Sequence, residues 1–100
     1  MTDLYPVSPG EILEEEFLKP MHISAYKLAK EVHIPQSRLS DIISGKRRIT
    51  ADTAMRFAQY FGTTPQFWLN IQNQFDLDRL KASDKILDIS DIRPCNLMQG

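Results

Sequence analysis

Four basic side chains lie close together in the segment IPQSRLSDIISGKRRI, residues 34–49: Arg38, Lys46, Arg47 and Arg48. Asp41 is the single acidic residue of this segment, although the whole chain of 100 residues has a formal net charge of −1. Guanidinium and ammonium groups can bind the phosphates of a nucleic acid, and serine, glutamine and arginine can also read base edges. The segment therefore raises the hypothesis of a local contact with DNA.

The rest of the chain does not share this positive charge. Residues 1–34 hold six acidic residues against three lysines, residues 35–50 hold four basic residues against one acidic residue, and residues 51–100 hold six acidic residues against five basic ones. A single basic segment in a chain that is otherwise slightly acidic indicates a specific contact patch, because a general affinity for polyanions would need positive charge over the whole surface.

The composition is typical of a small globular domain. Hydrophobic residues make up 42% of the chain and charged residues 25%, and 100 residues suffice for one domain. No apolar run approaches the roughly 20 residues of a membrane span, and the start MTDLYPVSPG lacks the features of a signal peptide. Cys95 is the single cysteine and cannot form an internal disulfide. We therefore expect a cytoplasmic protein that has no membrane partner.

The ionisable residues follow no pattern of a metal site or of a catalytic site. His22 and His33 are isolated, and no Cys/His pair has the spacing of metal ligands. Nothing aligns a serine, a histidine and an aspartate for nucleophilic catalysis, and no carboxylate pair has the surroundings that acid–base chemistry needs. The sequence thus predicts no metal, no cofactor and no enzymatic activity.

Capping signals and hydrophobic periodicity predict five helices. The first begins after Ser8, where Pro9 and Glu11 complete a capping box, and we expect it to end near Leu18, before Pro20. The other four are predicted at about residues 25–33, 35–44, 51–61 and 65–83. The fold class is therefore all-α.

The C-terminal part of the chain is less helical in its pattern. The stretch KILDISDIRP, residues 85–94, is rich in β-branched residues, which predicts an extended arm or a short edge strand. The last residues, CNLMQG, are expected to be frayed. We accordingly divide the chain into a helix-turn-helix domain, residues 1–82, and a C-terminal arm, residues 83–100.

The second and third predicted helices, joined by a tight turn through Ile34 and Pro35, have the arrangement of a helix-turn-helix. The third helix is narrow, and its polar side chains are small or form hydrogen bonds, which suits the major groove of B-DNA. The loop GKRRIT follows directly, where the phosphates of a bound duplex would run. The same cations could instead form the solvated surface of an ordinary helical bundle.

Four stretches of the sequence resemble the HigA group of bacterial antitoxins, also called VapI-type proteins: SPGEILEEEFLKPM, ISAYKLAKEV, IPQSRLSDIISGKRRIT and ADTAMRFAQYFGTTPQFWLNIQNQFDL. This group belongs to the lambda-repressor-like, Xre-type class of helix-turn-helix proteins. The resemblance extends from about Val7 to Leu80, and FGTTPQFWLNIQ is its most specific part. It implies a five-helix lambda-repressor-like domain in a homodimeric repressor of its own operon. It also implies that the protein neutralises a HigB-like ribonuclease, a toxin that cleaves messenger RNA.

Two other functions remain open at this point. One is a free-standing Xre-type transcriptional regulator that has no toxin. The other is a protein-interaction adaptor that binds an acidic protein and not DNA through its basic loop.

The resemblance places a DNA-recognition helix at about residues 35–44. The residues that it assigns to base reading are Gln36, Ser37, Ser40 and Asp41. The residues that it assigns to phosphate binding are Ser24, Ala25, Tyr26, Arg38, Lys46, Arg47 and Arg48, the first three through free N–H groups at a helix N-terminus. Whether Arg38 reaches a phosphate or a guanine is left open. Asp41 departs mildly from the expected chemistry, because a carboxylate repels phosphates although it can accept from cytosine N4.

Two further surfaces are candidates for protein partners. Trp68, Ile71 and Phe75 form an apolar stripe on the last helix, which faces either the core or a second subunit. A homodimer is expected because one recognition helix contacts few base pairs, whereas two helices roughly 34 Å apart read a palindromic operator. Glu14 and Glu15 lie on an acidic face of the first helix, which is either merely solvated or a contact for a basic toxin.

Overall fold

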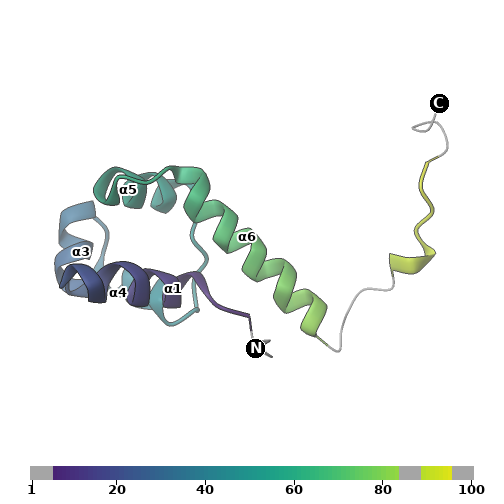
Figure 1. Cartoon of the computed structure of the whole chain (residues 1–100), viewed down its shortest axis with the longest axis horizontal. Coiled ribbons are helices and arrows are strands. Elements are labelled where there is room, and N and C mark those ends of the chain that lie inside the picture. Colours follow the sequence, from purple (N-terminus) through teal and green to yellow (C-terminus); the bar gives the residue numbers. More distant parts are fainter. Residues whose placement is uncertain (1–5, 84–88, 96–100) are drawn as a thin grey trace.

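The computed structural model describes residues 6–83 and 89–95. Within these ranges the chain forms five helical segments and one short 3₁₀ turn, and it forms no strand. The first four helical segments gather into a bundle. The last one begins within this bundle and then extends away from it (Figure 1). This confirms the prediction of an all-α fold with five helices. None of the helices described has both the length and the hydrophobicity of a membrane span.

The first helical segment begins where the capping signals predict. It consists of α1 (Pro9–Ile12), the π-helical turn η1 (Leu13–Leu18) and α2 (Lys19–Met21), which follow one another without a break. The Ser8 Oγ atom accepts a hydrogen bond from the Glu11 N–H at 3.2 Å, and Glu11 Oε1 accepts one from the Ser8 N–H at 3.1 Å. These two bonds form the predicted capping box.

The end predicted for this helix is wrong, because the helix continues through Pro20 and ends at His22. His22 has the left-handed backbone conformation, with φ 56°. In a regular α-helix a proline ring clashes with the carbonyl group four residues earlier. Here the residues directly before the proline form wide π-helical turns, with Lys19 N–H bonded to the carbonyl of Glu14, five residues earlier. The wider turn accommodates the ring, so proline does not stop the helix.

The other four helices lie within one or two residues of their predicted bounds. They are α3 (Ala25–Val32), α4 (Gln36–Ile43), α5 (Ala51–Phe61) and α6 (Pro65–Ala82). Ser24 and Thr64 cap α3 and α6 through their side-chain oxygens. The 3₁₀ turn η2 (Ile89–Asp91) is the element described in the C-terminal arm. The edge strand suggested for residues 85–94 is absent from residues 89–94, while residues 84–88 and the expected frayed end, residues 96–100, lie outside the described ranges.

Trp68 lies at the centre of the hydrophobic core. Its side chain is fully buried, and its indole N–H donates to Thr63 Oγ1 at 2.7 Å. The rings of Phe17, from the first helix, and Phe57, from α5, lie 4.9 Å and 5.2 Å from it between centroids. Of the two positions that the sequence left open for Trp68, the core and a subunit interface, the structure shows the core, where this residue joins three helices.

The remaining members of the predicted stripe are less buried. Ile71 packs against the core, and both Ile71 and Phe75 keep part of their surface exposed. The guanidinium carbon of Arg79 lies 5.3 Å from the centre of the Phe75 ring, a cation–π contact within α6.

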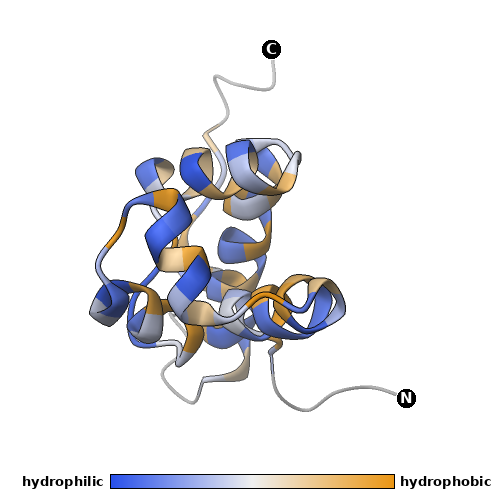
Figure 2. Ribbon diagram, turned by 90° about the vertical axis from the view of Figure 1, so that its left-hand side faces the viewer, coloured by the Kyte–Doolittle hydropathy of each residue, from blue (hydrophilic) through white to orange (hydrophobic). Residues whose placement is uncertain are grey.

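The helices of the bundle each carry hydrophilic and hydrophobic residues (Figure 2). In α4 the side chains of Leu39 and Ile42 are each 1% exposed and belong to the core. This burial fixes the rotation of α4 about its axis, so its polar residues must face outward.

Gly10 lies where the first helix meets the C-terminal end of α4. A Cβ atom on Gly10 would lie 2.3 Å from the carbonyl oxygen of Ile43 and 2.4 Å from that of Ile42. Backbone oxygens cannot rotate away as the end of a side chain can. The two helices can approach this closely because residue 10 has no side chain, so the glycine permits the position that α4 takes.

Replacing Gly10 with alanine should destabilise the protein. At an exposed position inside a helix the same change stabilises by up to about 1 kcal/mol. Here the methyl group would push α4 away from the first helix, and we expect a net loss of about 1–3 kcal/mol in the free energy of unfolding. Urea unfolding followed by circular dichroism measures this difference.

The control for this experiment is Gln59→Ala, at an exposed position of α5. Its free energy of unfolding should change by less than about 0.5 kcal/mol. A Gly10→Ala protein that is at least as stable as the wild type would contradict the close contact.

Candidate nucleic-acid interface

The predicted base-reading residues share one side of α4. Residues 36, 37, 40 and 41 fall within an arc of about 140° on a helix that turns by roughly 100° per residue. Gln36, Ser37 and Ser40 are exposed, whereas Asp41 is half-buried at the edge of this arc. The outward face of α4 thus consists of small or amide side chains that can form hydrogen bonds with a partner.

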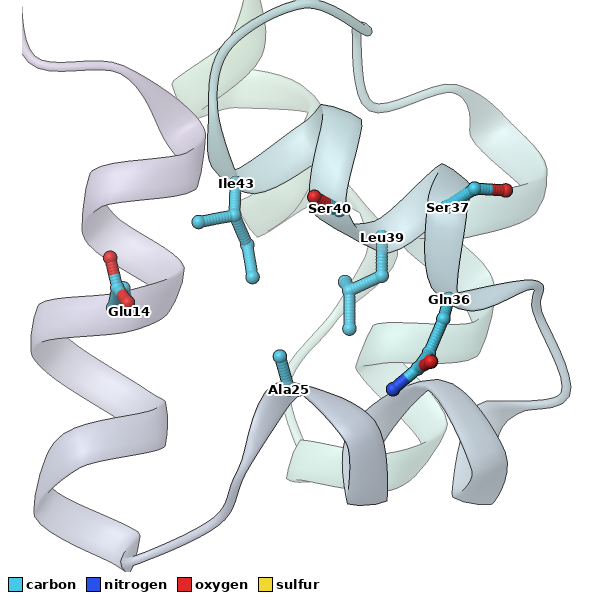
Figure 3. Close-up of a pocket in the computed structure, with 7 residues that line it drawn as sticks. All are labelled: Glu14, Ala25, Gln36, Ser37, Leu39, Ser40 and Ile43. Atoms are coloured by element: carbon cyan, nitrogen blue, oxygen red, sulfur yellow. The ribbon is translucent and has the colours of Figure 1, made fainter.

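An open groove of about 550 Å³ runs along this face of α4 (Figure 3). It is lined by Glu14, Ala25, Gln36, Ser37, Leu39, Ser40 and Ile43. Ala25 is the first residue of α3, so the predicted phosphate-binding end of α3 and the predicted base-reading face of α4 meet in one place. Ser24 and Tyr26, on either side of it, are exposed. The first N–H groups of a helix have no partner within the helix and can bind an anion.

Glu14 lies on the first helix, across this groove from α4 (Figure 3). The acidic side of the first helix and the predicted base-reading face of α4 therefore meet at Glu14. Glu15 is exposed and accepts a hydrogen bond of 2.6 Å from Lys19 Nζ. This bond and the charge of Glu15 raise the pKa of Lys19 above its ordinary value.

Arg56 of α5 holds the turn between α3 and α4, although nothing in the local sequence pattern had marked it as a site residue. Its Nη1 atom donates to the carbonyl oxygens of Val32 at 2.9 Å and His33 at 3.4 Å, and its Nε atom donates to Asp52. His33 has the left-handed conformation, with φ 63°, at the end of α3. The guanidinium group therefore binds the last carbonyls of one helix and stabilises the sharp turn into the next.

Arg38 is engaged within the protein. Its Nη2 atom donates to Asp52 Oδ2 and to Thr53 Oγ1, each at 2.7 Å, and its side chain is 25% exposed. The hydrogen bonds from Arg38 and Arg56 hold the pKa of Asp52 below its ordinary value, so the carboxylate is charged at neutral pH. The Arg38 guanidinium group therefore points toward the first turn of α5, where Asp52 and Thr53 lie.

The loop between α4 and α5 presents two cations to solvent. Gly45 has φ +87°, and the N–H groups of Lys46 and Arg47 donate to the carbonyl of Asp41 at 2.8 Å and 3.1 Å. The side chains of Lys46 and Arg47 are exposed, and neither has a hydrogen-bond or ion-pair partner within the part of the chain that the structure describes. They can therefore bind an external anion without breaking an internal bond.

Arg48 is the fourth cation of the segment, and it pairs with Asp76 of α6. Its Nε atom lies 3.2 Å from Asp76 Oδ2, and its Nη2 atom donates to the same oxygen. Partial burial of the Asp76 carboxyl acts to raise its pKa. The hydrogen bonds from Arg48 and Gln72, together with the positive charges of Arg48 and Arg79, outweigh this effect and hold the pKa below its ordinary value. Among the described residues, two of the four cations are therefore paired and two are not.

The described residues contain no group of three or more histidine, cysteine, aspartate or glutamate side chains that could hold a metal ion. The exposed side chains on the outward face of α4 and in the following loop instead suit recognition of a partner by hydrogen bonds and charge.

Comparison with known proteins identifies relatives of the whole arrangement. The family model described as "Helix-turn-helix" matches residues 15–68, from the first helix to the beginning of α6. Virulence-associated protein I of Dichelobacter nodosus is 47% identical over 83 residues, which make up 83% of this chain and 77% of that protein.

Two solved structures share the fold over nearly their full length. One contains the antitoxin HigA of Pseudomonas aeruginosa with the higBA promoter, with a TM-score of 0.80 and 37% identity over 89% of this chain and 97% of that one. The other is an addiction module antidote protein of the HigA family from Coxiella burnetii, with a TM-score of 0.79 and 47% identity over 91% of this chain and 99% of that one.

Proposed function

The chain belongs to the Xre-type helix-turn-helix family, among the HigA antitoxins, and from this membership we propose that it is a DNA-binding antitoxin. In this role it represses its own operon and neutralises a HigB-like toxin that cleaves messenger RNA. The family consists of DNA-binding regulators and antitoxins and is not a class of enzymes. The observation that carries the proposal is the outward face of α4, which exposes Gln36, Ser37 and Ser40. Beside it are Lys46 and Arg47, whose side chains have no partner among the described residues.

The dimensions of this face fit double-stranded DNA. An α-helix such as α4 is about 10–12 Å in diameter with its side chains, and the major groove of B-DNA is about 12 Å wide. With α4 in the groove, Gln36, at its N-terminal end, would read a base, and its amide can pair with adenine through two hydrogen bonds. Ser37, Ser40 and Asp41 would lie along the same groove.

The phosphates on either side would meet the two ends of the helix-turn-helix. Lys46 and Arg47 follow the C-terminal end of α4, and the N–H groups of residues 24–26 lie beside its N-terminal end. Phosphate contacts carry no sequence information, so they would position α4 while its side chains select the sequence.

We also propose that two copies of the chain bind a palindromic operator as a symmetric dimer. Leu77 and Leu80, in the second half of α6, are 53% and 43% exposed. Helical geometry puts them on the side of α6 opposite Phe75. The second half of α6 extends away from the bundle (Figure 1). Burial of these leucines against a second copy would remove apolar surface from water and would pair two recognition helices on one face of the DNA.

Base-reading and phosphate-binding residues should respond differently to mutation. Gln36→Ala should weaken binding to a duplex from the region upstream of the gene by about 1–3 kcal/mol and leave binding to a random duplex unchanged. Lys46→Ala and Arg47→Ala should weaken both duplexes similarly. Each should also reduce the slope of log affinity against log salt by about 0.9 per subunit.

Fluorescence anisotropy at several salt concentrations measures these affinities, with Gln59→Ala as the control. Equal loss on both duplexes for Gln36→Ala would show that α4 does not read bases. Wild-type affinity that is no higher for the upstream duplex than for the random one would refute the repressor proposal.

The double change Leu77→Glu/Leu80→Glu should dissociate the dimer and preserve the helical circular dichroism signal, because both side chains are exposed in a single chain. Sedimentation velocity at micromolar concentration measures the oligomeric state. The matched control is Asn70→Glu, at an exposed position in the first half of α6, which should remain a dimer. A dimeric double variant would place the interface elsewhere, and a wild-type protein that stays monomeric with operator DNA would refute the dimer.

Glu14 and Glu15 are the proposed contacts for the toxin, and their positions predict two different phenotypes. Glu15→Lys should weaken binding of the basic protein encoded beside this gene and leave operator binding nearly unchanged. Glu14→Lys should alter both affinities, because Glu14 lines the groove beside the base-reading residues. Titration calorimetry measures the affinities for the toxin and for the operator. The charge-matched control is Glu31→Lys, at an exposed position of α3.

Unchanged toxin affinity in both variants would remove the first helix from the toxin interface. If the wild-type protein binds no neighbouring gene product but does bind the operator, the free-standing regulator is the correct function.

A further inference from the structure

The backbone of the loop between α4 and α5, residues 45–50, is hydrogen-bonded to the buried side-chain amide of Gln72 in α6. Gln72 is 3% exposed, and its Oε1 atom accepts a hydrogen bond of 2.8 Å from the N–H of Ile49. The side chain of Ile49 is 1% exposed and anchors the same point of the loop in the core. Gln72 Nε2 donates in turn to Asp76 Oδ1 at 3.0 Å. The amide therefore has a partner at each end, and it orients the Asp76 carboxylate.

The other oxygen of the Asp76 carboxylate, Oδ2, binds the side chain of Arg48, the residue before Ile49. Asp76 Oδ2 accepts from both Nε and Nη2 of Arg48. Arg48 and Ile49 are thus both held by one turn of α6, through Asp76 and Gln72. The Arg48 side chain is 59% exposed, so the ion pair lies at the surface, within reach of an external anion.

We propose that Asp76 is an internal counterion that competes with DNA phosphate for Arg48 and so sets the strength of phosphate binding by the loop. This inference rests on the proposed DNA-binding function. In the free protein each subunit then offers Lys46 and Arg47 to the DNA backbone and withholds Arg48.

The competition follows from the charges involved. If Arg48 turned to a phosphate, Asp76 would lose its ion-pair partner and keep the hydrogen bond from Gln72. Its negative charge would then lie close to a polyanion, and the two would repel each other. An arginine that is already neutralised by a carboxylate releases few counterions from DNA, so it contributes little to the salt dependence of binding. Lys46 and Arg47, two residues and one residue earlier, have no such counterion within the described residues.

The test uses a substitution that breaks one of the two bonds of Asp76. In Asp76→Asn the amide oxygen can still accept from Gln72, whereas the amide nitrogen cannot accept from Arg48. We expect Asp76→Asn to bind operator and random duplexes more tightly, and to steepen the salt dependence of log affinity by about 0.9 per subunit. Arg48→Ala in the wild-type background should leave the slope unchanged. The double variant Arg48→Ala/Asp76→Asn should return to the wild-type slope.

These measurements separate the inference from its alternatives. A slope that falls by about 0.9 per subunit in Arg48→Ala would show that Arg48 already binds a phosphate, and would overturn the proposal. A gain in affinity that persists in the double variant would show that Asp76 acts through its own charge and not through Arg48, which also overturns it. If Asp76→Asn does not fold by circular dichroism, the Arg48→Ala slope alone decides.

Arg47→Ala and Lys46→Ala serve as the reference for the proposed function. If neither changes the salt slope, the loop does not bind phosphate and the DNA-binding role fails. If both reduce it while Asp76→Asn leaves it unaltered, the DNA-binding role stands and the counterion proposal fails.

Discussion

The close approach of Gly10 to the carbonyl oxygens of Ile42 and Ile43 permits the position of α4, and the recognition surface depends on that position. Two backbones meet there, so neither side can adjust by rotating a side chain. With the end of α4 held against the first helix, Leu39 and Ile42 enter the core and the polar residues face outward. The groove along α4 therefore has one wall from the first helix.

Three polar contacts complete this arrangement, and each one joins the helix-turn-helix to a later helix. Arg56 binds the carbonyls that end α3, Arg38 binds the start of α5 through Asp52, and Gln72 of α6 binds the backbone of the loop after α4. Such bonds have directions, whereas apolar packing tolerates small shifts and rotations. The polar contacts thus define the orientation of a helix-turn-helix whose stability comes largely from the core around Trp68.

The same contacts divide the basic segment into two kinds of cation. Arg38 and Arg48 have carboxylate partners, and Lys46 and Arg47 have none within the residues that the structure describes. The number of basic residues in a segment therefore does not tell how many of them are free to bind a partner. In this protein the second half of α6 carries the exposed leucines and also holds a loop arginine, through Asp76.

The sequence by itself determined the five helices and the outward residues of α4, because caps, prolines, glycines and hydrophobic periodicity act over a few residues. It did not determine the end of the first helix, since the wide π-helical turns before Pro20 are not marked by any local signal. Only the tertiary structure decided that Trp68 is core, that Glu14 lines the recognition groove, and that two of the four cations are paired. Burial and ion pairing depend on distance in space, and Asp52 and Asp76 lie 14 and 28 residues from their arginines along the chain.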